Sequence, residues 1–423
     1  MPDNDISRII VFNKNGATAK GAAAVASSFP KSSSLFPDLG SHRAASVPLS
    51  YVKEADRANA PLTFPNLGIT LGYGDQSTLK KLNDHPAVSY AARAPRLGSI
   101  RPVRVAQAVP PKGLTWGLQT LGVQQLWKQG LNGEGVMVGH LDTGVDASHP
   151  ALKDRVAEFA EWDFLGGKVG KSSPHDSATH GTHTAGTICG VRVQGRSVGI
   201  APGAKLCSGL VIEGGDATAR VLGGLDWLVG LGVRVISMSL GFPGYNPVFT
   251  RLVDILVSRN IVPVFAIGNE GPNSSRSPGN YPQSFAVGAI DQDEHVALFS
   301  SSQHFDRKDD PDKPDCVAPG VGVISAKPGG GWQEMDGTSM ATPHVAGLVA
   351  LLLQAKPNAS APELQEAILA SAVPITGEPP LRYGHGVVHA VEALKALQTP
   401  HSAAVKTRPP RKVKSKRARK AKG

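Results

Sequence analysis

The stretch Gly337-Thr338-Ser339-Met340-Ala341-Thr342-Pro343-His344 opens the longest apolar helical pattern of the chain, which runs on towards Ala355. A helix that begins here brings backbone N–H groups and the positive end of its dipole to the Ser339 side chain. We expect Pro343 to lie in the first helical turn, where proline is tolerated. A serine at the start of a buried helix predicts a nucleophile with an anion-binding site beside it.

Apolar runs of strand length alternate with helical patterns between residues 117 and 397. The helical patterns 217–231 and 248–259 have apolar residues at three- and four-residue spacing. Continuous apolar strands joined by helices predict an α/β domain, with a parallel sheet covered by helices on both faces. Ligands of such a domain bind at the carboxyl ends of the strands. The predicted strands are 136–141, 233–238, 261–267 and 285–290.

Two further polar segments lie where these elements end or begin. Segment 138–144 (VGHLDTG) ends a predicted strand on Asp142, and segment 180–186 (HGTHTAG) leads into a helix from His180. A serine hydroxyl is a poor nucleophile until an imidazole takes its proton, and the imidazole needs a carboxylate to fix its tautomer. Asp142, His180 and Ser339 are therefore the candidate catalytic residues.

The three segments resemble the catalytic motifs of the subtilisin-like serine peptidases, the subtilase family, whose triad also has the chain order Asp, His, Ser. The resemblance covers roughly residues 116–397. It implies a serine endopeptidase that cleaves protein and peptide substrates through an acyl-enzyme and requires no cofactor. Segment 266–271 (AIGNEG) resembles the oxyanion loop of the family, which implies that Asn269 donates a hydrogen bond beside the Ser339 N–H.

The same resemblance implies a substrate-binding edge, where main-chain pairing gives affinity and a side-chain pocket gives selectivity. Arg276 aligns with the floor of that pocket. Two interpretations stay open for it: a cation that selects Asp or Glu in the substrate, or a solvated loop arginine. The residues implied to bind substrate are Ser239, Leu240, Gly241, Ala266 and Gly268.

Other polar residues near the motifs have simpler interpretations. We expect His149, His183 and His344 to make structural hydrogen bonds, and His175 and Asp176 to be loop residues. No metal site is predicted. Calcium is compatible with the family, but its usual ligand pattern is missing, since Ala151 stands where calcium-binding members often carry an acid. The acidic run 309–312 lacks EF-hand spacing and predicts a solvated loop.

The charge of the chain divides it into three parts. The 423 residues have a net charge of +10, which is unevenly distributed. Residues 1–110 contain 13 basic and 7 acidic residues, residues 111–398 contain 21 and 27, and residues 399–423 contain ten basic residues and no acidic one. We therefore expect a propeptide-like domain with its connector (1–110), the catalytic domain (111–398) and a disordered basic tail (399–423).

The N-terminal part has the pattern of a small α+β unit. Strand-like runs at 8–12 and 88–92 flank an extended segment at 62–73 and a helical pattern at 76–84. The unit resembles the inhibitory propeptide of subtilases, and its +6 against −6 favours docking onto the catalytic domain. The resemblance implies a folding assistant and inhibitor, with self-cleavage somewhere within 101–115. Segment 94–113, with four prolines and no acidic residue, predicts an exposed connector.

Composition limits the remaining possibilities. With 41% apolar and 18% charged residues the chain can bury a core, and no apolar run reaches the ~20 residues of a membrane span. A polar N-terminus without a signal pattern and three unpaired cysteines indicate a cytoplasmic protein, with non-standard secretion or a misannotated start as alternatives. The tail predicts binding to nucleic acid or another polyanion, or a solubilising extension. The rival function is a catalytically silent subtilase-like scaffold that binds polyanions through this tail.

Overall fold

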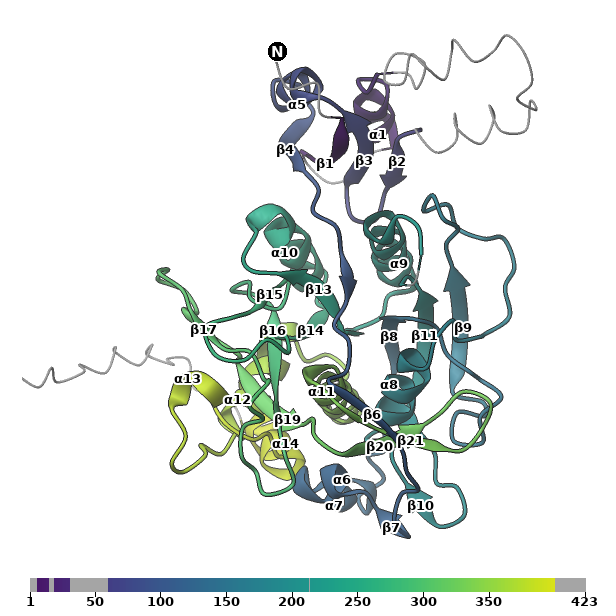
Figure 1. Ribbon diagram of the computed structural model, residues 1–423, viewed down its shortest axis with the longest axis vertical. Helices are drawn as coiled ribbons and strands as arrows, with labels where there is room; N and C mark the ends of the chain where they lie inside the picture. Colours follow the sequence, from purple (N-terminus) through teal and green to yellow (C-terminus); the bar gives the residue numbers. More distant parts are fainter. Residues whose placement is uncertain (1–5, 15–18, 31–59, 213, 400–423) are drawn as a thin grey trace, which may run out of the picture.

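The structure is a computed structural model that describes residues 6–14, 19–30, 60–212 and 214–399. Apart from Thr399, the basic tail lies outside the described residues, so its disorder and its polyanion binding stay predictions. The described chain forms a small sheet unit at its N-terminus, which sits on a larger α/β domain (Figure 1).

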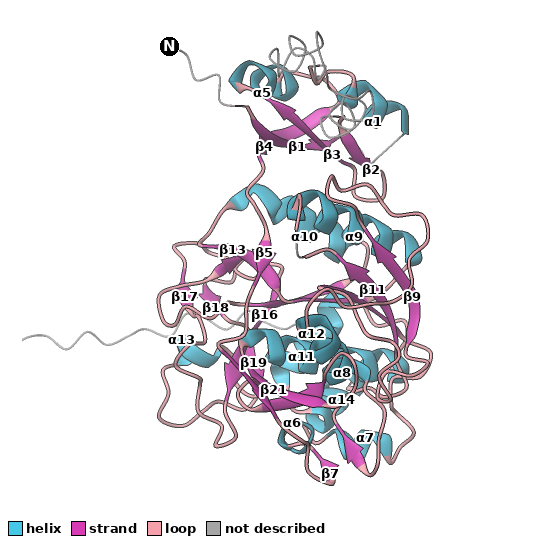
Figure 2. Ribbon diagram, turned by 45° about the vertical axis from the view of Figure 1, so that its right-hand side comes forward, coloured by secondary structure: helices cyan, strands magenta, loops and turns pink. Residues whose placement is uncertain are grey.

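The N-terminal unit is an antiparallel four-stranded sheet with two helices on its outer face (Figure 2). Strand β1 is apolar on both faces because both are covered. Ile9 and Val11 pack with the helices, whereas Ile10 and Phe12 pack with residues of the larger domain. In sheet order the strands are β2 (Leu62–Phe64), β3 (Ile69–Gly74), β1 (Ser7–Asn13) and β4 (Val88–Arg93), and the helices are α1 (Ala19–Ala26) and α5 (Gln76–Asn83).

The larger domain is built on a parallel sheet of seven strands, as the sequence predicts. Its central strands are buried along their whole length, which explains why they read as continuous apolar runs. In sheet order the strands are β19 (Cys316–Pro319), β16 (Phe285–Ile290), β14 (Val262–Ala266), β12 (Val235–Met238), β8 (Met137–Asp142), β11 (Lys205–Leu210) and β9 (Val156–Glu161).

Helices cover both faces of this sheet and create two cores. Val262 and Val264 of β14 pack in the core that contains α8 (His180–Cys189) and α11 (Thr338–Ala355). Phe265 of the same strand packs in the core that contains α9 (Ala217–Leu231) and α10 (Thr250–Ser258). Of the described helices, α11 has the length and apolar composition of a membrane span, but 89% of it is buried inside the domain.

Short elements complete the larger domain. Helix α12 begins with a capping box, in which Ser360 and Glu363 exchange hydrogen bonds with each other's backbone. The helices are α6 (Trp116–Thr120), α7 (Val123–Trp127), the 3-10 helix η2 (Pro247–Phe249), α12 (Ala361–Ala370), α13 (Pro380–Tyr383) and α14 (Ala390–Gln398). The short strands are β7 (Gly113–Leu114), β10 (Arg196–Ser197), β15 (Arg276–Ser277), β17 (Gln303–His304), β18 (Asp312–Lys313) and β20 (Val323–Ala326).

The segment that joins the two units differs from the exposed connector that we expected. Strand β5 (Gly98–Ser99) pairs with β13 (Leu240–Pro243), and β6 (Arg104–Gln107) pairs with β21 (Trp332–Asp336). The side chains of Leu97 and Ile100 are buried. Figure 1 shows this segment running from β4 down the larger domain to β6. The expectation was therefore wrong for Leu97 and Ile100, whereas residues 103–105 are exposed. Backbone pairing over two to four residues leaves no mark on composition.

Candidate active site

The predicted catalytic residues lie at the carboxyl edge of the parallel sheet. Asp142 is the last residue of β8, His180 is the first residue of α8, and Ser339 is the second residue of α11. All three are at most 6% exposed. The two helices pack against one another in the same core.

Asp142 and His180 form a buried, directed hydrogen bond. His180 Nδ1 lies 2.7 Å from Asp142 Oδ1, which also accepts the Thr143 N–H at 2.7 Å. Burial on its own would raise the pKa of Asp142, but His180 and the Thr143 amide outweigh it and keep the pKa below its usual value. The carboxylate is therefore ionised at neutral pH. Since it accepts a hydrogen bond from the Nδ1–H of His180, the Nε2 atom is left as the basic nitrogen.

A second histidine supports the same carboxylate, and the sequence did not predict it. His140 Nδ1 lies 2.9 Å from Ser208 Oγ, and His140 Nε2 lies 2.9 Å from Thr184 Oγ1. The Thr184 hydroxyl is in turn 3.2 Å from Asp142 Oδ2. Burial lowers the pKa of His140, so its ring is neutral. The only sequence signal was its place two residues before Asp142, on the same side of a strand.

Asp176 is more than the loop residue that we expected. Its Oδ2 accepts the backbone N–H of Thr182 at 2.7 Å and the Thr182 hydroxyl at 2.6 Å. Its Oδ1 accepts the Thr143 hydroxyl at 2.7 Å. Asp176 thus ties the residue after Asp142 to the first turn of α8, which carries His180. A single acid in a polar loop gives no sign of such a clamp.

Ser339 is covered by the connector. Its hydroxyl donates a hydrogen bond of 2.8 Å to the carbonyl oxygen of Ile100. Pro343 lies in the second turn of α11, not in the first as we expected. Proline has no N–H for the carbonyl four residues earlier, which is that of Ser339. The Ser239 hydroxyl donates to this carbonyl at 3.2 Å and offsets the loss.

Asn269 is held with its amide nitrogen towards the connector. Its Oδ1 accepts two hydrogen bonds of 2.9 Å from Thr338, one from the backbone N–H and one from the hydroxyl. The Nδ2 group donates to the carbonyl oxygen of Arg101 at 2.9 Å. Asn269 therefore presents an N–H donor to the chain that crosses the site, as an oxyanion site requires.

The predicted substrate-binding edge is occupied by the connector. The Ile100 N–H donates to the Ser239 carbonyl at 3.1 Å, and β5 pairs antiparallel with Leu240 and Gly241 of β13. Ala266 ends β14, which brings the oxyanion loop to this edge. Gly268 has a φ of +124°, and a Cβ atom here would lie 2.6 Å from Glu270 Oε2 and 2.9 Å from Ser301 Oγ. A side chain at position 268 would therefore strain the backbone and clash with these two residues.

Neither interpretation of Arg276 describes its surroundings fully. The guanidinium is 19% exposed and makes an ion pair with Glu270, in which Nε lies 2.7 Å from Oε1 and Nη2 makes a second contact. Its charge is thus matched within the protein. An acidic substrate side chain would have to compete with Glu270 for it.

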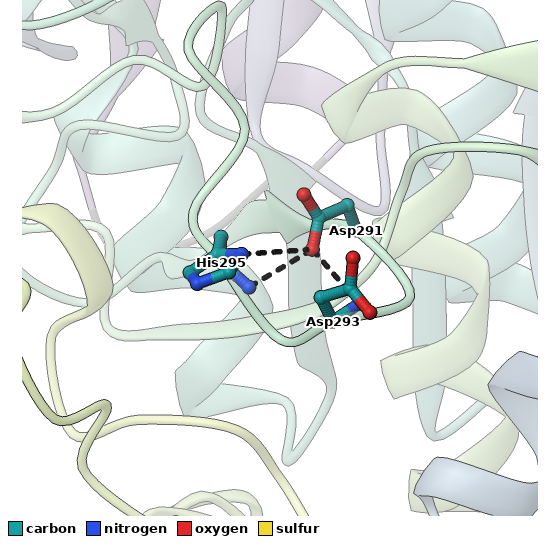
Figure 3. A group of neighbouring side chains, drawn as sticks. All are labelled: Asp291, Asp293 and His295. Atoms are coloured by element: carbon teal, nitrogen blue, oxygen red, sulfur yellow. Dashed lines mark hydrogen bonds and ion pairs between the residues drawn. The ribbon is translucent and has the colours of Figure 1, made fainter.

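One group of the described residues has the geometry to hold a metal. Ligand atoms of Asp291, Asp293 and His295 lie within 4.8 Å of one another (Figure 3). Asp291 Oδ1 already accepts the backbone N–H groups of Asp293 and His295, so the cluster is also explained as a turn. This group does not have the oxygen-rich shell that calcium prefers.

The acidic run 309–312 is followed by Lys313, whose side chain is buried and makes ion pairs. The fully buried Lys313 ammonium lies 2.6 Å from Asp310 Oδ2, 2.8 Å from Asp315 Oδ2 and 2.8 Å from the Ser284 carbonyl. These contacts make Asp310 part of a buried ion-pair network, where a solvated loop was expected. The three histidines expected to be structural do bond to carbonyl oxygens: His149 to Gly331, His183 to Val323 and His344 to Met340.

Comparison with known proteins agrees with this geometry. The family model described as "Subtilase family" matches residues 133–391, which include Asp142, His180, Asn269 and Ser339. The chain is 32% identical to subtilisin E of Bacillus subtilis (strain 168) over 323 residues, 74% of this chain and 77% of that protein. It is 34% identical to the alkaline protease of Shouchella clausii over 336 residues, 79% of this chain and 80% of that protein. It also matches bacillopeptidase F of Bacillus subtilis (strain 168) at 32% over 322 residues, 67% of this chain and 22% of that protein.

Proposed function

The chain belongs to the subtilase family and is a serine endopeptidase of that type, and we propose that Asp142, His180 and Ser339 are its catalytic triad. The observation that carries this assignment is the buried 2.7 Å bond between Asp142 and His180, at the edge where Ser339 touches a backbone carbonyl. The hydrogen bond from the Ser339 hydroxyl to the Ile100 carbonyl oxygen places the proposed nucleophile beside this peptide bond.

In the proposed reaction each residue has one role. Asp142 accepts the Nδ1–H of His180, which fixes the tautomer and stabilises the imidazolium. His180 takes the proton of Ser339 as its oxygen attacks the substrate carbonyl carbon, and then gives it to the leaving amine. The oxyanion accepts hydrogen bonds from the Ser339 N–H and from Asn269 Nδ2. In the resting structure Asn269 Nδ2 donates to the next carbonyl of the connector, that of Arg101, so it has to turn to the reacting Ile100 carbonyl. Water then hydrolyses the acyl-enzyme by the same proton transfers in reverse.

We also propose that residues 1–100 are an inhibitory propeptide, which the enzyme removes by cleaving its own Ile100–Arg101 bond. The support is the way the connector lies in the site: β5 pairs with β13 up to Ile100, whose carbonyl accepts from Ser339. This bond lies immediately before the window of 101–115 that we inferred from the sequence. The N-terminal unit also makes polar contacts with the larger domain, among them the Arg8–Asp216 ion pair at 2.6 Å.

Expression of the wild-type chain and of Ser339→Ala tests both proposals. We expect wild type to yield a fragment whose N-terminal residue is Arg101, and Ser339→Ala to stay intact. A fluorophosphonate probe should label processed wild type in a 1:1 ratio. The same cut in Ser339→Ala would show that another protease makes it. Processed protein that the probe does not label would favour the silent scaffold.

A further inference from the structure

The connector pairs with the larger domain a second time, after it has passed Ser339. Strand β6 lies antiparallel along the edge of β21 that β20 leaves open, with Arg104 opposite Asp336 and Gln107 opposite Gln333. The Val103 N–H also donates to the Asp336 carbonyl at 2.7 Å. Figure 1 shows β6 beside β21. A peptide that adds a strand to an open sheet edge is bound mainly through its backbone.

The position of β6 relative to the proposed cleavage site determines which residues of a substrate the edge of β21 would bind. Counted from the Ile100–Arg101 bond, Arg104 is the fourth residue after it, and Gln107 is the seventh. The edge of β21 therefore guides the part of the chain that leaves the site, just as β13 guides the part that enters it.

Along β6, the charged side chain of Arg104 is the one that makes a specific contact with the larger domain among those described here. Val103 and Val105 are each 56% exposed, so neither is enclosed in a pocket. Arg104 makes an ion pair with Glu334, and its Nη1 lies 3.8 Å from Asp336 Oδ2. Glu334 and Asp336 are two residues apart on β21 and so lie on the same face of the strand.

The two carboxylates belong to β21 of the larger domain, whereas the cation, Arg104, belongs to the connector. The side chains of Glu334 and Asp336 are 22% and 12% exposed, against 56% for that of Arg104. Asp336 is held in addition by the Gly322 N–H, which donates to Oδ1 at 2.7 Å. An anionic site of this kind is preformed for a cation at one position of a bound strand.

We propose that the open edge of β21, with Glu334 and Asp336, is a substrate subsite that selects Lys or Arg four residues after the cleaved bond. Its first occupant is Arg104 of the connector, and protein substrates follow once the connector is cut and leaves. This inference rests on the proposed function, because the count starts at Ile100–Arg101. The recognised substrate class is an extended chain with a basic residue at that position.

Internally quenched peptides with the connector sequence 97–107 (LGSIRPVRVAQ) test the proposal. Three versions differ only at the fourth residue after the bond, which is Arg, norleucine or Glu. For each processed enzyme, kcat/KM is divided by its own value for the norleucine peptide, so a general loss of activity cancels. The enzymes are wild type, Glu334→Gln, Glu334→Lys and the matched control Glu392→Gln, which removes a surface carboxylate on α14.

For wild type and Glu392→Gln we expect the Arg peptide to be cleaved about two- to fivefold better than the Glu peptide, since a partly exposed ion pair discriminates to this extent. Glu334→Gln should reduce the ratio, and Glu334→Lys should invert it. The preference should also shrink between 50 mM and 1 M NaCl. Equal cleavage of the three peptides by wild type, or the same ratio in wild type and Glu334→Gln, would overturn the proposal.

A second measurement does not depend on activity. Hydrogen exchange of segment 103–107 is compared in intact Ser339→Ala and in Ser339→Ala/Glu334→Gln. We expect faster exchange in the double variant, because the charge pair helps to hold β6 on β21. Unchanged exchange would contradict the inference even if the enzyme cleaved no peptide at all. Failure of the proposed function is a different result: no fluorophosphonate labelling and no self-cleavage.

Discussion

Asn269 combines two tasks in one side chain, and the structure separates them by atom. Its Oδ1 accepts from Thr338 at the start of α11, and its Nδ2 points to the crossing chain. The first task is structural, and the second is the catalytic role that we propose. A substitution that keeps one and removes the other can therefore tell them apart.

We predict that Asn269→Asp and Asn269→Ala both lower kcat by about 10²–10³-fold with little change in KM, the magnitude known for the oxyanion asparagine of subtilisin. Asn269→Asp keeps an acceptor for Thr338, whereas Asn269→Ala loses it. Only Asn269→Ala should therefore also lower the melting temperature clearly. Steady-state kinetics with active-site titration and a thermal melt measure the two effects. A kcat within fivefold of wild type in both variants would contradict the role of the Nδ2 donor.

Asp142 can support His180 in the proposed reaction because its carboxyl group is ionised. His180 and the Thr143 amide hold the pKa of this carboxyl below its usual value, so it is charged at neutral pH. We predict that Asp142→Asn keeps the fold but lowers kcat by about 10⁴-fold, because an amide can stabilise the wrong tautomer of His180 and cannot balance the imidazolium. The far-UV spectrum controls for folding. A loss below tenfold would show that His180 does not depend on this partner.

Among the elements, α8 and α11 each bury a neutral histidine. The ring of His183 in α8 donates to the Val323 carbonyl, and that of His344 in α11 donates to the Met340 carbonyl. Burial is the main cause of their low pKa values, about 3 for His183 and about 4 for His344. In the unfolded chain both would titrate near 6.5. Between these values the unfolded state binds more protons than the native state.

The sign of the pH dependence follows from this difference. The free energy of unfolding has its full value above about pH 7 and falls as the pH is lowered towards 4, by at most about 1.4 kcal/mol per pH unit for each histidine. We predict that His344→Gln lowers the slope of the unfolding free energy against pH between pH 4.5 and 6. The decrease should approach about 1.4 kcal/mol per pH unit, the value for one proton. Urea unfolding of Ser339→Ala and of Ser339→Ala/His344→Gln at several pH values measures this slope in each protein. Parallel curves for the two proteins would show that His344 is protonated in the native state.

The sequence predicted several of the regular, covered elements, but it did not predict strands β11 and β19, which are buried as well. The runs at 136–141 and 285–290 correspond to β8 and β16, and the pattern at 217–231 corresponds to α9. Burial on both faces makes a strand uniformly apolar, and one buried face makes a helix periodic. The sequence did not predict the two-residue strand β5 or the Ala-rich α1, because neither has enough side chains to form a pattern.

For the site, local motifs predicted Asp142, His180, Asn269 and Ser339, which the fold brings to one edge of the sheet. The supporting residues His140 and Asp176 were missed or misjudged. Their roles depend on partners 44 and 33 positions away, respectively, such as Thr184 for His140 and Thr143 for Asp176. A motif records neighbours along the chain, whereas a hydrogen bond across loops is decided by the fold.

Across the whole molecule, the opposite charges of the two units meet at few places. Arg8 of β1 makes an ion pair with Asp216, with side chains 11% and 18% exposed. Asp226 of α9 accepts the Leu67 N–H at 3.0 Å and an Asn66 N–H at 3.3 Å. The difference of +6 against −6 therefore acts mainly as a general attraction, and the half-buried Arg8–Asp216 pair is the specific charged contact on which a test can be built.

Asp216 allows a clean test of this contact, because it also caps α9 by accepting the Ala219 N–H at 3.0 Å. Asn is as good an N-cap as Asp, so Asp216→Asn keeps the cap and removes the charge. We predict that it weakens the hold of the cleaved N-terminal unit about tenfold, as expected for a lost charged hydrogen bond. Activity should then appear with a shorter lag after self-cleavage, and salt should shorten that lag less than in wild type.

Arg8→Ala should have the same effect, and combining it with Asp216→Asn should add little. If the lag instead shortened additively in the double variant, the two residues would act independently, and docking would depend on the overall charge and the apolar face of the sheet.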